Sequence, residues 1–334
     1  MIFSRFRVGL PPDVRGQLGV RVFFVISGFL ITGLLLKELD KTATVNLGKF
    51  YFRRTLRIFP PYYFYLFVIL FFSLIGLVDT PLASFLPAFT YTSNYIHPNT
   101  WNLGHTWSLS VEEQFYLIYP GVLLLFGRRK IVWLLGLLII ISPFVRVLDF
   151  KVFGDVEAVW ITKGFHSNAD ALAAGCLLAV LYGYLHQNRF YLKLLDSKLI
   201  IFAPILIFFF NAQLDHPIIY LGISFTVSIF LIALCIDWAV THHDDNFVGK
   251  FLNSSPMVTL GVMSYSIYLW QQPFFNHQSS AWFTAFPFNL IGIALFSCFS
   301  YYVVEKLSLQ WRQSLESKIF APVERNAVVP MAVR

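Results

Sequence analysis

The sequence predicts an all-α fold, a polytopic bundle of about nine transmembrane helices. Of its 334 residues, 57% are hydrophobic and only 13% are charged, whereas about a quarter of an ordinary soluble domain is charged. The mean hydropathy is +0.65. The apolar residues form runs of roughly 17 to 22, the length that a helix needs to cross about 30 Å of hydrocarbon. Alternating barrel patterning is absent, which leaves bundled helices to satisfy the backbone in lipid.

Nine apolar runs give the predicted spans, and the sixth is short. They cover residues 19–36, 61–78, 111–126, 131–148, 169–185, 199–211, 218–239, 257–275 and 288–304. Connections on one side of the bilayer hold thirteen Lys and Arg residues, and those on the other side hold three. Basic residues are retained in the cytoplasm, so we expect the richer side to face it. The net charge of +7 therefore reflects membrane topology and a lipid partner, and we expect no nucleic-acid partner.

Residues 1–304 form the predicted transmembrane domain, and residues 305–334 form a predicted cytoplasmic tail. Nine alternating spans with a cytoplasmic tail place the N-terminus outside. Four arginines nevertheless cluster there, namely Arg5, Arg7, Arg15 and Arg21. A preceding helix that this chain lacks would remove the conflict. Arg21 is expected to snorkel to the outer interface.

The three cysteines of the chain all lie inside apolar runs. Cys176, Cys235 and Cys298 show no CxxC pair and no spacing typical of a metal site. They are interpreted as small packing residues, and no metal is predicted.

The polar segment 102–116 enters the third span from the outer side and supplies the candidate catalytic residues. It holds His105, two serines, Glu112 and Glu113. Polar groups inside apolar runs are costly and indicate function. An imidazole and a carboxylate can together activate a hydroxyl as a nucleophile. Helix capping by a serine and a carboxylate is the alternative interpretation.

The segment 49–61 supplies the candidate anion-binding residues, Arg53, Arg54 and Arg57. Arg53 and Arg57 are four residues apart and share one helix face, a spacing suited to a phosphate. Juxtamembrane arginines also commonly set topology or contact anionic lipid, and this alternative stays open.

Two further sets of residues are weaker candidates. Asp170 at the start of the fifth span and Tyr265, Trp270 and Gln271 in the eighth could line an outward cavity that binds a polyol. Anchoring at the membrane interface is the alternative for the aromatic residues. Within the first span, Ser27 and Gly28 are interpreted as a close helix contact.

Four separated segments resemble the signatures of the acyltransferase-3 family of membrane O-acyltransferases, in the same order. They are GVRVFFVISGFLITGLLLKE, FYFRRTLRIFPPYY, LGHTWSLSVEEQFYLIYP and LGVMSYSIYLWQQPFF, which lie between residues 19 and 275. The resemblance implies a bacterial inner-membrane enzyme with ten spans when complete. It implies acyl-CoA, most often acetyl-CoA, as donor and a surface carbohydrate as acceptor, such as lipopolysaccharide, exopolysaccharide or peptidoglycan-linked glycan. It also assigns the CoA to Arg53, Arg54 and Arg57.

The chain departs from the family pattern at its start. Family members carry a first helix with a catalytic His near its outer end, whereas residues 1–6 resemble only the tail of that helix, with Arg5 near the position of the His. A truncated or mis-assigned start is the favoured interpretation, because an arginine cannot act as a base at neutral pH. The alternatives are a variant in which His105 is the base, and an inactive remnant.

These inferences combine into one mechanism. Acyl-CoA binds the arginines from the cytoplasm, and a His oriented by Glu112 or Glu113 deprotonates a sugar hydroxyl that attacks the acyl carbon. A glycan or lipid-precursor transporter is the rival, although the paired halves or broken helices of many transporters are not visible. A non-catalytic receptor is a third possibility, for which the short loops offer no obvious ectodomain.

Overall fold

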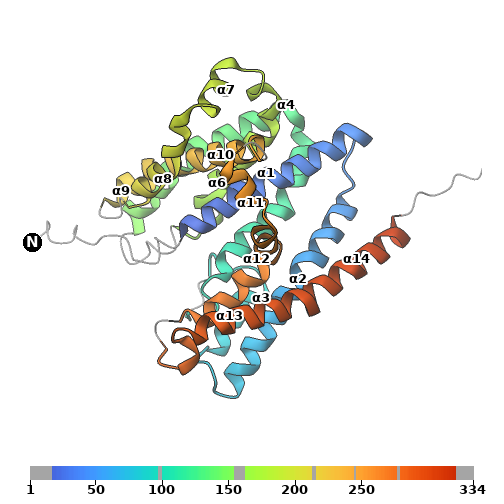
Figure 1. Cartoon of the computed structure of the whole chain (residues 1–334), viewed down its shortest axis with the longest axis vertical. Coiled ribbons are helices and arrows are strands. Elements are labelled where there is room, and N and C mark those ends of the chain that lie inside the picture. Colours follow the sequence, from blue (N-terminus) through green and yellow to red (C-terminus); the bar gives the residue numbers. More distant parts are fainter. Residues whose placement is uncertain are drawn as a thin grey trace, which may run out of the picture.

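The computed structural model describes residues 17–96, 100–153, 162–212, 216–243, 246–276 and 279–320, and every regular element among them is helical. The helices form two lobes (Figure 1). The upper lobe contains α1 (Gln17–Thr42), α4 (Thr106–Phe153), α6 (Phe165–Leu185), α7 (Arg189–Leu195), α8 (Ala203–Asn211), α9 (Pro217–Ile219) and α10 (Phe225–Thr241). The lower lobe contains α2 (Leu47–Leu74), α3 (Phe85–Phe89), α12 (Ser255–Phe274), α13 (Phe288–Phe299) and α14 (Lys306–Ile319), and α11 (Phe247–Leu252) joins the lobes.

Six helical stretches in the described part are long and apolar enough to cross a membrane. They are Gln17–Thr42, Leu47–Leu74, Thr106–Phe153, Phe165–Leu185, Pro217–Thr241 and Phe288–Ile319. The predicted eighth span lies on α12, which is not among them, because serines, tyrosines and glutamines dilute its apolar residues. The predicted sixth span lies in the shorter apolar stretch Lys198–Asn211. The predicted all-α membrane fold is therefore confirmed, with six long apolar helices among the described residues.

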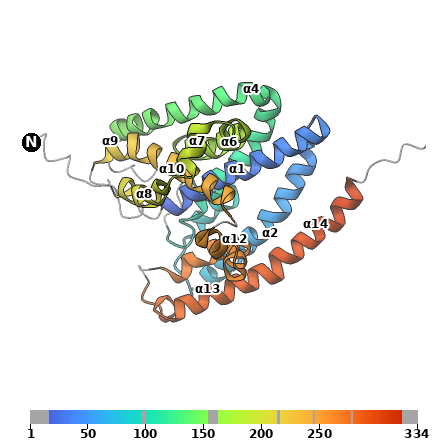
Figure 2. The same ribbon diagram turned by 45° about the horizontal axis from the view of Figure 1, so that its top comes forward.

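Helix α4 joins two predicted spans in one element. Its 48 residues would extend roughly 70 Å if straight, more than twice the hydrocarbon thickness. The chain turns at Gly127, whose φ of 66° and ψ of 172° are not helical, and Figure 2 shows the two arms of α4 meeting at a bend. Glycine adopts this positive φ without a steric penalty. The bend lies in the gap between the predicted spans 111–126 and 131–148.

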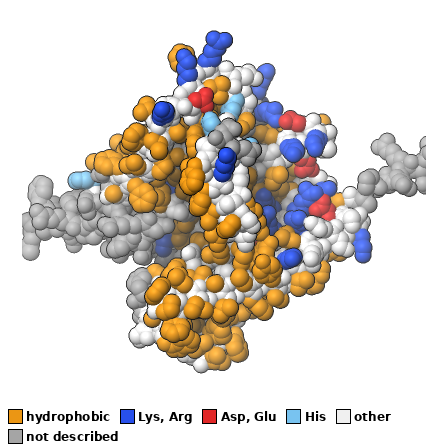
Figure 3. All heavy atoms as spheres, in the orientation of Figure 1, with side chains coloured by type: hydrophobic (Ala, Val, Ile, Leu, Met, Phe, Trp, Pro, Cys, Tyr) orange, Lys and Arg blue, Asp and Glu red, His pale blue; other side chains and the backbone are white. Residues whose placement is uncertain are grey.

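The surface is apolar where a soluble protein would be polar. Leu125, Trp133 and Phe208 are more than two-thirds exposed, while His105, Glu112 and Asp170 are buried. Figure 3 shows hydrophobic side chains over the lower and left faces, and charged side chains at the top, around α7, and at the right, where α1 and α14 end and α2 begins. This distribution fits a bundle whose solvent is lipid.

The closest helix contact in the upper lobe is the crossing of α1 and α6. A Cβ on Gly28 would overlap the backbone of Leu172, and a Cβ on Gly175 would overlap the backbone of Val25. Each glycine therefore admits the other helix's backbone, as small residues do in membrane bundles. The predicted packing role of Gly28 is confirmed. Because Ser27 is the neighbouring residue, this helix contact also fixes its position inside the bundle.

The seam between the lobes runs along the first turns of α4. Trp107 and Val111 belong to the apolar core of the upper lobe, whereas Leu103 and Leu109 belong to that of the lower lobe. This segment packs into both cores at once, so polar side chains placed on it lie at the boundary between the lobes.

Helix α14 continues without a break from α13 through the π-helical turn η8 (Ser300–Glu305). It packs along α2, where the hydroxyl of Ser308 donates a hydrogen bond to the carbonyl of Leu56. The predicted boundary between a domain 1–304 and a tail 305–334 stays a prediction. The described part of that tail nevertheless lies against the bundle.

We expect Gly28→Ala and Gly175→Ala each to destabilise the protein by about 1–3 kcal/mol, because the added methyl group must push two packed helices apart. The measurement is the denaturation midpoint of the purified protein in detergent. Gly33→Ala is the matched control, because a Cβ on Gly33 of the same helix has nothing within 4 Å. Equal midpoints for Gly28→Ala and Gly33→Ala would contradict the close crossing.

Candidate functional site

The inner part of the candidate site is centred on Glu112, a carboxylate only 4% exposed. It accepts hydrogen bonds from the hydroxyls of Ser27 on α1 and Tyr116 on its own helix. These two hydroxyls are also 2.6 Å apart. The guanidinium of Arg54 lies 4.9 Å from the centre of the Tyr116 ring, which links this carboxylate to the arginine segment of α2.

Glu113 is the second carboxylate of this segment, and its Oε1 is buried without a hydrogen-bond partner in the described part of the chain. No acidic residue lies in the first turn of α4, which begins at Thr106. Capping therefore does not account for either carboxylate. A buried carboxylate oxygen that lacks a partner is costly, so a hydrogen-bond donor placed beside it would stabilise this position.

The outer part of the site surrounds His105, which directly precedes α4. Its ring makes edge-on contacts with Tyr65 and Tyr268, each at 5.3 Å between ring centres. Both ring nitrogens are buried without a hydrogen-bond partner among the described residues. Burial lowers the pKa of His105 to about 3, so the imidazole stays neutral at physiological pH and can accept a hydrogen bond.

The structure does not join His105 to the two carboxylates. Glu112 bonds instead to Ser27 and Tyr116, and the hydroxyl of Tyr268 donates to the carbonyl of His105 at 3.1 Å. The expected imidazole–carboxylate pair is thus two separate centres on successive turns of one segment. A helix rises only about 10 Å over seven residues, which is the scale of their separation.

The arginine segment occupies the first half of α2. Arg53 makes a two-pronged ion pair with Glu316 of α14, and Lys49 lies 3.3 Å from the same carboxylate. Arg57 is close enough to act electrostatically on Glu112 and on Glu305. The arginines therefore extend from the end of the bundle towards the buried carboxylates.

Three site residues escaped the sequence reasoning. Ser27 was interpreted only as a packing residue, although it also bonds to Glu112. Glu305 is 3% exposed and accepts a hydrogen bond of 3.0 Å from Ser266 of α12. Arg312 on α14 lies near the three arginines of α2. An acidic residue at the end of the last apolar run was a signal for Glu305, whereas no sequence pattern relates α14 to α2.

The four predicted substrate residues do not form one cavity in the structure. Asp170 is fully buried in an ion pair of 2.7 Å with Arg146 in the upper lobe. Trp270 is 1% exposed and packs in the lower core. Tyr265 donates a hydrogen bond to the carbonyl of Ile58 at 3.1 Å, and Gln271 is half-buried. Their role in substrate binding stays a prediction.

Arg21 was expected to snorkel, and this expectation is wrong. Its side chain is 1% exposed, bonds to the hydroxyl of Tyr220 and lies 4.1 Å from the centre of the Phe225 ring. The partners inside the upper lobe hold the guanidinium in the bundle. Arg5 and the other residues of the segment 1–16 lie outside the described residues.

A polar cavity of about 390 Å³ opens between the end of α2, the loop before α4 and the end of α12. Its lining includes Asp79, Trp101, Asn102 and Ser279. The carbonyl of Asn102 accepts a hydrogen bond of 2.6 Å from Tyr65, the residue whose ring packs on His105. Tyr65 therefore links the lining of this cavity, through Asn102, to His105.

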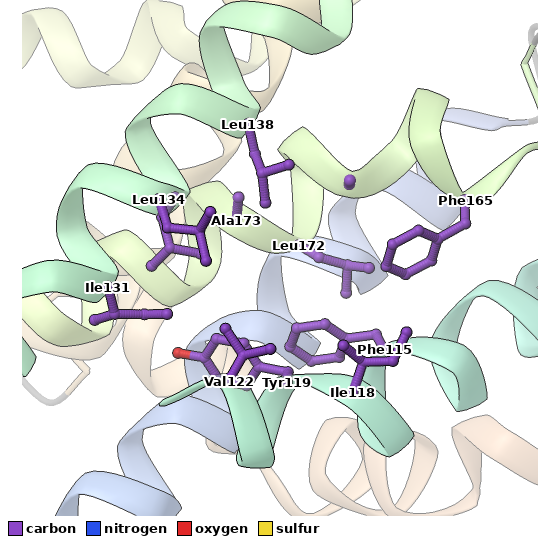
Figure 4. A pocket seen from close by; sticks show the side chains of 12 residues that line it. Phe115, Ile118, Tyr119, Val122, Ile131, Leu134, Leu138, Phe165, Leu172 and Ala173 are labelled. Carbon is purple, nitrogen blue, oxygen red and sulfur yellow. The ribbon is translucent and has the colours of Figure 1, made fainter. Parts of the chain in front are cut away.

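A different cavity, between the two arms of α4 and α6, is apolar (Figure 4). It has a volume of about 200 Å³ and is lined by residues such as Phe115, Leu134 and Leu172. The hydroxyl of Tyr119 at its edge accepts a hydrogen bond of 2.8 Å from Thr32. The lining offers no group suited to a sugar or a phosphate. Within the described residues, no group of three or more His, Cys, Asp or Glu is arranged to hold a metal ion.

Comparison with known proteins identifies the family of this chain. The chain matches the acyltransferase-3 family model, described as an acyltransferase domain, over residues 1–305. It is 33% identical over 288 residues to "O-acetyltransferase OatA" of Staphylococcus aureus, covering 77% of this chain and 46% of OatA. It is 27% identical over 289 residues to "Putative peptidoglycan O-acetyltransferase YrhL" of Bacillus subtilis, covering 77% of this chain and 44% of YrhL.

The chain spans about half the length of the curated relatives it matches. No solved structure matches it. The family match covers both candidate centres and the arginine segment, and the fold is a bundle of long apolar helices. The chain is therefore a multi-pass integral membrane protein that belongs to the acyltransferase-3 family of bacterial membrane acyltransferases.

Proposed function

We propose that this protein transfers an acetyl group from acetyl-CoA to a hydroxyl of a cell-wall glycan outside the cytoplasm. The observation that carries the proposal is the position of Glu112, a buried carboxylate on α4 that lies between the arginines of α2 and the outer polar cavity. The relatives named O-acetyltransferases support the acetyl group, and the one named for peptidoglycan supports that acceptor over lipopolysaccharide.

The proposed topology has nine spans at the predicted positions, with the arginine end of the bundle in the cytoplasm. The thirteen-to-three bias of basic residues supports this orientation. The polar cavity is lined by residues of 77–81, 100–102 and 273–283, and the connections 79–110 and 277–287 contain no Lys or Arg. The cavity is accordingly assigned to the outer face.

The donor fits the arginine end chemically. Guanidinium groups bind phosphates through planar, paired donors, and an acyl-CoA carries several phosphates at one end and a neutral acyl thioester at the other. Arg53, Arg54 and Arg57 would hold the phosphates while the thioester end reaches Glu112.

The chemistry requires a base for the acceptor hydroxyl and stabilisation of the oxyanion on the acyl carbon. Glu113, whose Oε1 lacks a partner among the described residues, is the candidate base, and the neutral imidazole of His105 can accept a hydrogen bond from the acceptor hydroxyl. Tyr116 and Arg54 border Glu112 and can donate to developing negative charge. The acceptor hydroxyl loses its proton, its oxygen bonds to the acyl carbon, and the CoA thiolate leaves.

Glu112→Gln should lower acetyl transfer by about 100-fold or more, because Glu112 holds Tyr116 and Arg54 where negative charge develops, and electrostatic groups of this kind typically contribute that much. The amide keeps the size of the side chain but loses the negative charge that faces Ser27, Tyr116 and Arg54. The measurement is acetyl ester formation on isolated cell-wall glycan with labelled acetyl-CoA. The matched control is Asp40→Asn, an exposed carboxylate near the end of α1 that pairs with Arg128. Full activity in Glu112→Gln, together with full activity in Glu113→Ala and Arg57→Ala, would refute the proposed function.

Asp79→Asn should raise the KM for the glycan several-fold and leave the KM for acetyl-CoA unchanged, because a carboxylate can accept hydrogen bonds from two sugar hydroxyls. Both constants are measured by steady-state kinetics with a soluble glycan fragment. Asp149→Asn serves as control, because Asp149 pairs with His166 and does not line the cavity. A change confined to the KM of the donor would contradict an acceptor site at this cavity.

A further inference from the structure

Helix α14 presents one face to the arginine segment of α2. Ser308, Arg312 and Glu316 follow each other at four-residue intervals, so they lie on the same side of the helix. Ser308 donates to the carbonyl of Leu56, and Glu316 pairs with Arg53. Arg312 lies between these two contacts, and its charge is close enough to repel those of Arg53, Arg54 and Arg57.

The cationic side chains at this end of α2 and α14 have few ion-pair partners among the described residues. Lys49 and the four arginines lie together, and Glu316 is the carboxylate that pairs with two of them, Lys49 and Arg53. The Nε of Arg312 is buried without a hydrogen-bond partner in the described part of the chain. Placing a fourth guanidinium here is unfavourable without an anion, because like charges at short range repel. The arrangement is that of a site which binds a multiply charged anion.

We infer that α14 completes the donor site: Arg312 binds a phosphate of the acyl-CoA, and Glu316 occupies Arg53 until that phosphate displaces it. This inference rests on the proposed function and extends it, since residues beyond 305 lie outside the family match. The terminal phosphomonoester of an acyl-CoA carries about two negative charges. It therefore competes well with the single carboxylate of Glu316 for the guanidinium of Arg53.

The two α14 residues then act in opposite directions on donor binding. Loss of Arg312 removes a cation that binds the phosphate of the donor. Loss of the Glu316 charge removes a competitor and frees both Arg53 and Lys49. A purely structural role of α14 predicts a different result. In that case, loss of the Glu316–Arg53 ion pair and loss of Arg312 would both loosen the contact between α14 and α2, and both would weaken CoA binding.

The test is CoA binding to the purified full chain in nanodiscs of neutral lipid, with binding constants from titration calorimetry. Arg312→Gln is expected to raise the Kd for CoA about tenfold, within the range for one hydrogen bond to a charged group. Glu316→Gln is expected to lower the Kd several-fold. Lys318→Gln is the matched control, since Lys318 belongs to the same helix, is exposed and lies two residues from Glu316, about 200° around the helix; the Kd of this variant is expected to equal that of the unaltered protein.

Several outcomes would overturn the inference. An unchanged Kd in Arg312→Gln, or equal weakening in both variants, would show that α14 is not part of the donor site. If Arg57→Gln also leaves the Kd unchanged, the proposed function itself fails, which separates the two failures. Nanodiscs with anionic lipid test whether Arg312 binds the phosphate of a lipid headgroup. If Arg312→Gln alters CoA binding only there, the arginine binds a lipid headgroup instead of the donor. Melting curves of each variant identify any that do not fold.

Discussion

The structure depends on one constraint, that polar groups inside a lipid-embedded bundle must be satisfied by the protein itself. Glu112 meets this constraint through Ser27 and Tyr116. Ser27 reaches the carboxylate because Gly28, the next residue, brings α1 against the backbone of α6. The close helix contact and the buried carboxylate are thus parts of one arrangement. A change in the packing of α1 changes the surroundings of Glu112.

The same constraint explains why the candidate site lies at the seam between the lobes. Inside either lobe, aromatic and aliphatic side chains fill the space. Along the first turns of α4, two packed cores meet, and polar side chains from both lobes can approach each other there. Tyr268 of α12 and Ser27 of α1 come from opposite lobes, yet both bond to this segment. The seam also has an arginine of α2 beside Glu112 on one side and the outer cavity beside Asn102 on the other.

Much of this fold follows from the sequence because hydrocarbon imposes a length on every span. The apolar runs predicted the long helices, and the gap at residues 127–130 marked the turn at Gly127. Side-chain partners were harder to predict. Arg21 was wrongly placed at the interface, because hydropathy does not show that Tyr220 and Phe225, two hundred residues away, would receive it. The inner and outer centres were expected as one pair, because proximity in sequence gives no side-chain direction at a junction between two cores. Arg312 was missed for the related reason that helix pairing between α14 and α2 leaves no periodic signal.

The two centres on α4 also suggest how one bundle can serve a charged donor and an exported acceptor. Under the proposed function, the phosphates of the donor need not enter the bundle, because the arginines lie in the first half of α2, at its cytoplasmic end in the proposed topology. Only the neutral acyl end has to reach Glu112, and a neutral group enters a low-dielectric interior at far lower cost than a charged one. The remaining separation, from Glu112 to His105, is roughly two helical turns. The acceptor hydroxyl can cover that distance from the outer cavity, since a hydroxyl is also uncharged. The bundle then keeps every charged part of both substrates outside the hydrocarbon, and the transferred acyl group alone crosses from one side of the seam to the other.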